Sequence, residues 1–297
     1  MSTANTINEK TVNPRVVEVS PDWCPGCGDF GVLSSLKKAT LGKEIKAHEM
    51  VVVSGIGCSS NLPGYVNAYG VHSLHGRALP TATGAKLANH NLKVVVTGGD
   101  GDGFGIGVGH FIHAMRRNLD LTYVVMDNEI YGLTTGQASP TTMKDHKTKT
   151  TPRGNVEQPI NPLMLALVSG ATFVARAFSG QPAHLSSLIE QGIAHKGFAF
   201  IDVFSPCVTY NKINTYTWFK ERIYKLEDEA PDRDPADFSN AMSTAMEFDD
   251  RIPIGLVYKV EKPTYEDSEP VLLNGPLVKQ PLGIKKELFD QLLQETM

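Results

Sequence analysis

The chain has 297 residues, of which 41% are hydrophobic and 20% are charged, a composition typical of a folded globular protein with a sizeable core. Its formal net charge of -4 provides no positive field to hold nucleic acid or anionic lipid non-specifically. Residues 160–175, the most apolar stretch, fall short of the roughly 18–20 apolar residues that span a bilayer, and residues 1–15 lack the apolar segment of a secretory signal. We therefore expect a cytoplasmic protein with no nucleic-acid or membrane partner.

Strand and helix patterns alternate along the chain after residue 20. Short, β-branched apolar runs predict buried strands at 50–54, 93–97, 121–126, 172–175 and 198–203. Helical spacing of small and apolar residues predicts helices at 30–40, 79–89, 108–117 and 183–195. Such alternation predicts an α/β fold with a parallel sheet and helices on both faces.

The same patterns predict the domain organisation. We expect a polar N-terminal arm at 1–20, a main domain at 21–225 and a C-terminal extension at 226–297. Within the extension, residues 226–238 are acidic and contain proline, which predicts a solvated connection to a C-terminal tail.

The chain has four cysteines, Cys24, Cys27, Cys58 and Cys207, all in turns marked by glycine or proline. They are too few for a disulfide scaffold, and in a reducing compartment a C-x-x-C pair indicates metal, cluster or redox chemistry. Turns at the ends of strands can bring four thiolates from distant positions to one point. Spacing alone slightly favours an iron–sulfur cluster over zinc, and it leaves open that Cys58 or Cys207 is simply a buried thiol.

A glycine-rich turn at 98–103 lies between a predicted strand and a predicted helix, where backbone amides favour a phosphate. It matches neither the dinucleotide-binding fingerprint nor the P-loop. Asp100 stands among these glycines, and a carboxylate beside a diphosphate is favourable only if a cation such as Mg²⁺ lies between them. Asn128 follows the next strand and reaches the same sheet edge, so Asp100, Asn128 and the Ile130 carbonyl are candidate ligands. A flexible surface turn with a solvated Asp100 is the alternative.

The same segments contain motifs that are more specific to one protein family. An Asn follows the Asp of G-D-G by 28 residues, and the chain also contains C-P-G-C-G, G-I-G-C-S and D-N-x-x-Y-G-L-T-x-G-Q. From residue 21 to 207 the chain resembles the β subunits of 2-oxoacid:ferredoxin oxidoreductases, which depend on thiamine diphosphate. The resemblance implies the diphosphate-binding domain fold of thiamine diphosphate enzymes.

The resemblance also implies roles for individual residues. Cys24, Cys27, Cys58 and Cys207 would bind a [4Fe-4S] cluster, while Asp100, Asn128 and the Ile130 carbonyl would hold Mg²⁺ on the diphosphate. Gly99, Gly101 and Thr134 would contact the diphosphate, and Leu133 would lie near the central rings of the cofactor. Ser59, Asp102 and Gly132 are further candidates for cofactor binding. His75 is a candidate for cofactor binding and catalysis, with a structural role as the alternative.

The resemblance further implies an assembly and an activity. Thiamine diphosphate enzymes bind the cofactor between two domains, and this chain has room for one of them, so a partner α subunit would supply the pyrimidine domain and much of the coenzyme A site. The expected reaction is CoA-dependent oxidative decarboxylation of a 2-oxoacid to an acyl-CoA and CO₂, with electrons passed to ferredoxin, and a low-potential ferredoxin also permits the reverse reaction.

Substrate identity is the least determined part of this interpretation. We favour 2-oxoglutarate over pyruvate, and we expect Asn61 and Thr135 near the substrate. A non-oxidative thiamine diphosphate decarboxylase with structural cysteines, and an electron-transfer or scaffold subunit, are the alternative functions.

Overall fold

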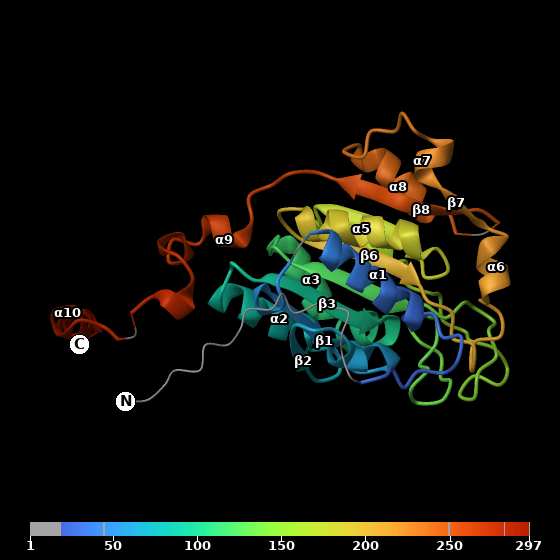
Figure 1. Ribbon diagram of the computed structural model, residues 1–297, viewed down its shortest axis with the longest axis horizontal. Coiled ribbons are helices and arrows are strands. Elements are labelled where there is room, and N and C mark those ends of the chain that lie inside the picture. Colours follow the sequence, from blue (N-terminus) through green and yellow to red (C-terminus); the bar gives the residue numbers. More distant parts are fainter. Residues whose placement is uncertain (1–18, 44, 249, 282, 297) are drawn as a thin grey trace, which may run out of the picture.

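The computed structural model of the chain describes residues 19–43, 45–248, 250–281 and 283–296. The predicted arm at 1–20 lies almost entirely outside these residues. Within them, eight strands form one sheet in the order β2-β1-β3-β4-β6-β5-β8-β7 (Figure 1). The strands are β1 (Met50–Ser54), β2 (Tyr69–His72), β3 (Lys93–Gly99), β4 (Thr122–Asp127), β5 (Phe173–Phe178), β6 (Ala199–Phe204), β7 (Ile223–Lys225) and β8 (Ile252–Lys259). All neighbouring pairs are parallel except β5 and β8, so β7 and β8 run opposite to the other six strands. The predicted parallel α/β sheet is confirmed, with these two strands added at one edge.

Helices cover both faces of the sheet, as predicted, because alternate strand residues point to opposite sides. Val51 and Val94 belong to the core that packs against α2 (Ala78–Ala88), α3 (Val108–Arg116), α4 (Pro162–Val168) and α8 (Phe238–Met246). Val52 and Val95 belong to the opposite core, beneath α1 (Asp29–Gly42) and α5 (Pro182–Ala194). Shorter helical segments are η1 (Ala47–Glu49), η2 (Cys58–Tyr65), η3 (Gly101–Ile106), α6 (Tyr216–Lys220), α7 (Leu226–Glu229), α9 (Tyr265–Ser268), η4 (Leu272–Asn274) and η5 (Leu277–Lys279). None of the helices in the described residues is long and apolar enough to cross a membrane.

The predicted strands correspond to β1, β3, β4, β5 and β6, and the predicted helices to α1, α2, α3 and α5. One difference concerns the glycine-rich turn, because helical structure begins at Gly101, as the π-helix η3, and not at 108. This wide turn requires glycine at position 103, because any larger side chain at Gly103 would overlap the Tyr123 hydroxyl.

The region after residue 225 differs from the prediction. Residues 226–238 are not simply a solvated connection, because they include α7, whose Leu226 is buried in the core. The chain then returns as β8, in which Ile252, Ile254 and Val257 are fully buried. The sequence pattern does not predict this strand, because it contains Pro253 and Gly255, and both residue types are unfavourable in strand interiors. Part of the segment predicted as an extension therefore belongs to the sheet.

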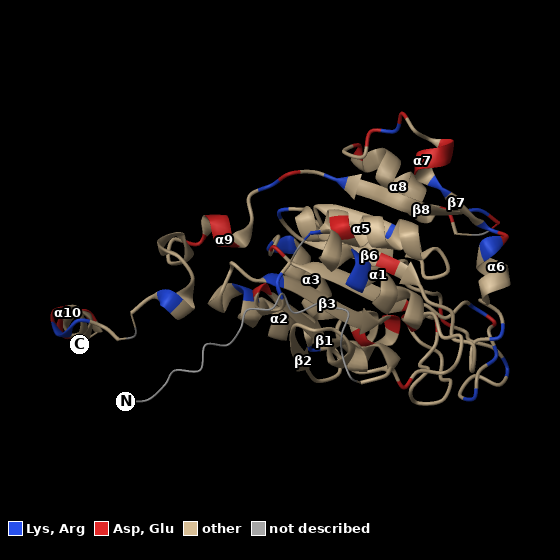
Figure 2. Ribbon diagram, in the orientation of Figure 1, with Lys and Arg blue, Asp and Glu red and all other residues tan. Residues whose placement is uncertain are grey.

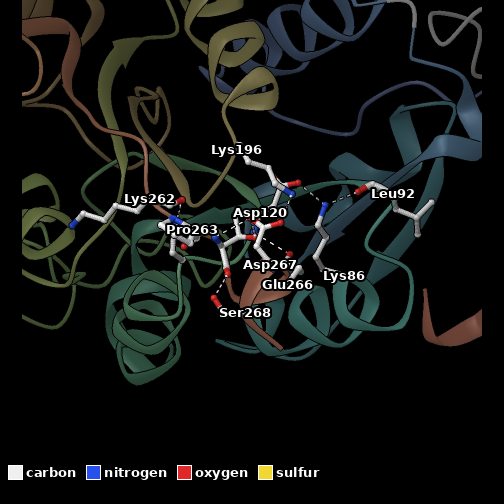
Figure 3. A network of polar contacts seen from close by, with 11 residues as sticks. Lys86, Leu92, Asp120, Lys196, Lys262, Pro263, Glu266, Asp267 and Ser268 are labelled. Atoms are coloured by element: carbon white, nitrogen blue, oxygen red, sulfur yellow. Dashed lines mark hydrogen bonds and ion pairs between the residues drawn. The ribbon is translucent and has the colours of Figure 1, made fainter. Parts of the chain in front are cut away.

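A network of polar contacts fastens the chain after β8 to the edge of the sheet opposite the carboxyl ends of the parallel strands (Figure 3). The buried Lys86 ammonium donates to Asp120 Oδ2 at 2.8 Å and to the Leu92 carbonyl at 3.0 Å. The Asp120 amide in turn donates to Glu266 Oε1 on α9 at 3.1 Å. Asn118 Nδ2 donates to the carbonyls of residues 262 and 263, at 3.2 and 3.0 Å.

Beyond α9 the chain leaves the body of the molecule and ends in α10 (Lys286–Thr296), which lies far from the sheet (Figure 1). We call residues 269–296 the C-terminal arm. Four large apolar side chains of α10 are 45% to 48% exposed: Leu288, Phe289, Leu292 and Leu293. Their spacing places them along one side of the helix.

Asn118 is the residue whose loss should loosen this attachment most. Its Oδ1 accepts from Thr172 Oγ1 at 2.8 Å and from the Phe198 amide at 2.9 Å, and its φ of 49° is one that Asn tolerates better than Ala. We expect Asn118→Ala to lower the free energy of unfolding by about 2–4 kcal/mol, because it leaves a buried amide unsatisfied and strains the backbone. Urea denaturation of the variant beside Asn91→Ala, an exposed control, measures this difference, and equal midpoints would contradict it.

Candidate functional site

A cavity of about 640 Å³ lies at the carboxyl ends of β1, β3 and β4. Its walls come mainly from the ends of these strands and the segments that follow them, together with Asp29 and His75. All predicted cofactor-binding residues other than Cys24, Cys27 and Cys207 line it, namely Cys58, Ser59, His75, Gly99, Asp100, Gly101, Asp102, Asn128, Ile130, Gly132, Leu133 and Thr134. The structure thus brings together residues that lie up to 76 positions apart, between positions 58 and 134.

Tyr131 holds the segment after β3 against the segment after β4. A side chain at Gly101 would overlap the Tyr131 ring, and the Tyr131 hydroxyl donates to the Gly101 carbonyl at 3.2 Å. The Tyr131 amide donates to the Gln137 carbonyl at 2.9 Å and closes the second loop on itself. These contacts fix Asp100 beside Asn128.

Asp100 belongs to a group of buried carboxylates. Thr141 Oγ1 lies 2.7 Å from Asp100 Oδ2 and 2.9 Å from Asp127 Oδ1, so one hydroxyl proton serves two carboxylates. Burial raises the pKa of Asp100, and burial together with the nearby Asp100 raises the pKa values of Asp127 and Glu129 well above their usual range. A cation at this position would therefore relieve an unfavourable concentration of negative charge.

Arg176 offsets part of this charge from the next strands. Its Nε lies 3.5 Å from Asp202 Oδ2, and both side chains are fully buried. Burial raises the pKa of Asp202 to about 6, although Arg176 opposes that shift, and burial lowers the pKa of Arg176. The single guanidinium of Arg176 faces several carboxylates, so the need for further positive charge remains.

The oxygen atoms near Asp100 are suitable ligands for a hard cation. Asn128 Oδ1 accepts from the Ile130 amide at 3.1 Å, and the Asn128 carbonyl accepts from Asn211 Nδ2 at 3.0 Å, which fixes the turn that carries both residues. A carboxylate, a side-chain amide and a backbone carbonyl form the all-oxygen set that Mg²⁺ prefers. The buried Ser59 hydroxyl also lines the cavity and has no partner among the described residues, as expected for a group that meets a ligand. The residues present therefore suit a magnesium diphosphate.

Asp102 ties the segment after β1, the His75 turn and η3 together. Its buried Oδ1 accepts from the amides of Ile56 at 2.9 Å and Gly76 at 2.7 Å, and it lies 3.0 Å from His75 Nδ1. Because a carboxylate can only accept, this contact orients the ring with Nδ1 toward Asp102. The His75 side chain is 39% exposed and lines the cavity, so Asp102 orients a ring that a ligand can reach.

The four cysteines come from three loops and all are free thiols. Burial raises the pKa of Cys58 to about 12, and Asp29, Cys207 and Cys24 add to the effect. The pKa of Cys27 also rises, mainly through burial and Asp29, with smaller effects of Cys58 and Cys207. Cys58 therefore lies within electrostatic reach of the other three thiols, and Cys27 within reach of Cys58 and Cys207.

Gly132 brings two of these sulfurs against the cavity wall. A Cβ built at Gly132 would lie 3.4 Å from Cys58 Sγ and 3.6 Å from Cys207 Sγ. In the described part of the chain, however, no three His, Cys, Asp or Glu side chains converge as they would around one metal ion. An iron–sulfur cluster distributes its thiolate ligands over separate irons, so its ligands need not meet at a single point. The thiol arrangement suits such a cluster.

Some predictions about cavity residues were incomplete. Asp29, Tyr131 and Gln137 line the cavity but were not among the predicted site residues, although Tyr131 and Gln137 stand inside the motif that follows Asp127. Asn61 and Thr135 are not among the described residues that line it, because Asn61 donates to Asp22 and Thr135 accepts from Lys149. Asp29 carries no sequence signal beyond its place next to the Cys24–Cys27 turn.

Asp29 predicts a pH dependence of stability. Its carboxyl is buried, accepts from Ser205 Oγ at 2.7 Å, and has a pKa raised by burial from 3.8 to about 6. As pH rises through this interval the unfolded chain releases the proton first, so the native state loses up to about 3 kcal/mol of stability from this group. Asp29→Asn should lose less stability than the wild type between about pH 4 and pH 7, as thermal unfolding midpoints would show. Parallel pH profiles would contradict this expectation.

The sequence matches two known protein families. Residues 48–203 match the family described as thiamine pyrophosphate enzyme, C-terminal TPP binding domain. Residues 207–273 match the family described as the C-terminal part of the pyruvate ferredoxin oxidoreductase beta subunit. The first match spans β1 to β6 and so includes the strands that end at the cavity.

Individual relatives agree with these families. The chain is 46% identical to a 2-oxoacid:ferredoxin oxidoreductase subunit beta from Sulfolobus sp, over 92% of this chain and 96% of the relative. It is 47% identical to the 2-oxoglutarate synthase subunit KorB from Archaeoglobus fulgidus, over 64% of this chain and 71% of the relative. A solved structure of the 2-oxoglutarate:ferredoxin oxidoreductase from Magnetococcus marinus superposes with a TM-score of 0.86 and 42% identity, covering 93% of each chain. The chain therefore belongs to the family of β subunits of 2-oxoacid:ferredoxin oxidoreductases.

Proposed function

We propose that this protein, together with an α subunit, catalyses the CoA-dependent oxidative decarboxylation of a 2-oxoacid to an acyl-CoA and CO₂, and that ferredoxin accepts the electrons. We favour 2-oxoglutarate as the substrate. The same machinery would run in the carboxylating direction when reduced ferredoxin is in excess.

One observation carries this proposal, namely that the cavity and the cysteine group share a wall. Cys58 lines the cavity itself, and Gly132 in the same wall faces both Cys58 Sγ and Cys207 Sγ. A group oxidised in the cavity would therefore lie directly beside a group able to accept electrons. A non-oxidative decarboxylase would not need thiols at this wall, and a scaffold subunit would not need the buried Asp100 on its other side.

Thiamine diphosphate is the proposed occupant of the cavity. When bound, it supplies a nucleophilic carbanion and stabilises the charge left on carbon after loss of CO₂. Asp100, Asn128 and Ile130 would hold Mg²⁺ on its diphosphate, and Gly99 and Thr134 would contact the diphosphate oxygens. His75, oriented by Asp102, lines the cavity and would form a hydrogen bond with the substrate or cofactor.

Cys24, Cys27, Cys58 and Cys207 are the proposed ligands of a [4Fe-4S] cluster, which would pass electrons one at a time out of the site. The raised thiol pKa values of Cys27 and Cys58 describe the protein without a cation beside them. Bound iron would favour the thiolates, because coordination displaces the thiol proton.

An α subunit is the proposed source of the remaining site. Among the described residues that line the cavity, His75 is the one whose side chain can carry a positive charge. A 2-oxoacid with a second carboxylate would need a cationic partner, and we propose that the α subunit supplies it together with the pyrimidine domain and the coenzyme A site. The solved relative has 2-oxoglutarate, coenzyme A and succinyl-CoA bound, which supports the preference for 2-oxoglutarate.

Steady-state kinetics of the purified αβ complex test the function and the substrate together. We expect CoA-dependent reduction of ferredoxin with a higher kcat/KM for 2-oxoglutarate than for pyruvate. A clear preference for pyruvate would overturn the substrate assignment. Release of CO₂ without acceptor reduction would support a non-oxidative decarboxylase.

Two variants should separate the cofactor from the cluster. Asp100→Asn removes a charge beside the diphosphate, so we expect it to weaken thiamine diphosphate binding at fixed Mg²⁺ by about tenfold or more while iron content stays unchanged. Cys207→Ser removes one thiolate and should lower iron content with a smaller effect on thiamine diphosphate affinity.

Isothermal titration with thiamine diphosphate and iron analysis of the same αβ preparations measure both quantities. Unchanged cofactor affinity in Asp100→Asn would show that the turn after β3 is not the metal site. Full iron content in Cys207→Ser would remove Cys207 from the cluster.

A further inference from the structure

Exposed basic side chains gather beside the cysteine group. We define the basic rim as Lys144, Lys147, Lys149, Arg153 and Lys212, all of which are exposed. The first four lie on the long connection between β4 and α4, and Lys212 lies five residues after Cys207. Figure 2 shows Lys and Arg along the loops on the α6 side of the molecule, beyond the strand ends.

The net charge of the basic rim has the opposite sign to that of the chain as a whole. Segments 134–153 and 207–220 together contain six Lys or Arg residues and a single acidic residue, Asp145, whereas the chain has a net charge of -4. A local positive field on an otherwise negative molecule selects where a negatively charged partner meets it.

Two contacts attach the rim to the loop that carries Cys207. Lys149 Nζ lies 5.5 Å from the centre of the Tyr210 ring, and the Tyr210 amide donates to Cys207 Sγ over 3.5 Å. Lys212 Nζ donates to the Val208 carbonyl at 2.5 Å. Two rim cations therefore contact the segment that directly follows one cysteine of the group.

The cysteine group is also accessible on this side. Cys24 is exposed and Cys207 is half-buried. Val208 packs against the turn between Cys24 and Cys27, since a Cβ at Gly26 would lie 3.7 Å from Val208 Cγ1. The loop that carries Lys212 thus adjoins the exposed cysteine, and a protein bound at the rim would come close to the proposed cluster.

We propose that the basic rim is the docking surface for a small acidic protein that carries one electron. The inference rests on the proposed function, because it assigns the exit of the electrons that decarboxylation releases. In each encounter one electron leaves the reduced cluster and reduces the oxidised carrier, and no bond forms or breaks. The two electrons from one substrate therefore leave in two encounters.

Charge reversal on the rim tests the proposal in the αβ complex. The test variant is Lys144→Glu/Lys147→Glu, which changes two exposed residues that do not line the cavity. Its matched control is Lys285→Glu/Lys286→Glu, the same charge change on the C-terminal arm, far from the rim (Figure 1). Thermal unfolding midpoints of both variants check that they fold as the wild type does.

We measure kcat/KM for an acidic ferredoxin at low and at high ionic strength, with the 2-oxoacid and CoA saturating. We expect the test variant to lose about tenfold or more at low ionic strength, a loss that shrinks with added salt, while the control stays within about twofold of the wild type. Reduction of methyl viologen, which needs no docking surface, and the KM for CoA should be unchanged.

Three results would overturn the proposal. Equal ferredoxin kcat/KM in test variant and wild type would place docking elsewhere. An equal loss in test variant and control would indicate a general effect of net charge. A raised KM for CoA with unaltered ferredoxin kinetics would indicate that the rim binds the phosphates of coenzyme A.

Titration of oxidised ferredoxin onto the complex separates this proposal from the proposed function. Weaker binding to the test variant than to the control supports docking at the rim even if no 2-oxoacid is turned over. Tight, equal binding to all three proteins overturns it even if turnover is normal.

Discussion

Six carboxyl groups are buried near the carboxyl ends of the central strands, those of Asp29, Asp100, Asp102, Asp127, Glu129 and Asp202, and the described residues place one guanidinium among them. Ionised carboxylates are costly in such surroundings unless positive charge is brought to them. This requirement links the features of the site. It explains why raised pKa values gather here, why the loops around Asp100 are tightly hydrogen-bonded, and why a divalent cation suits the cavity.

The sequence predicted the central part of the fold because its strands are short runs of β-branched residues buried on both sides, as in Val51 to Val53 and Val94 to Val96. It did not predict β8, because Pro253 and Gly255 interrupt the pattern, and the pairing of this strand with β7 and β5 joins segments that are distant in the sequence. The π-helix η3 was also missed. Its geometry depends on the close approach of Tyr123 and Tyr131, which no local pattern records.

The site was predictable where chemistry and motif coincide, as at Asp100 and Asn128, whose strands end side by side in the parallel sheet. It was less predictable where a role depends on packing. Asp102 lines the cavity as predicted, and packing also gives its Oδ1 a role that the sequence does not indicate, because it contacts two backbone amides and His75. Asn61 and Thr135 are expected near the substrate from their sequence neighbours, and the contacts of their side chains with Asp22 and Lys149 could not be read from those neighbours.

The C-terminal arm extends away from the side of the sheet opposite the cavity, and its helix α10 carries four half-exposed apolar side chains. An isolated helix of 11 residues is marginal in water, and an uncovered apolar stripe promotes self-association. This apolar stripe and the cavity therefore lie at different ends of the molecule. Changes that improve its behaviour in solution can be made on the arm without disturbing the cavity.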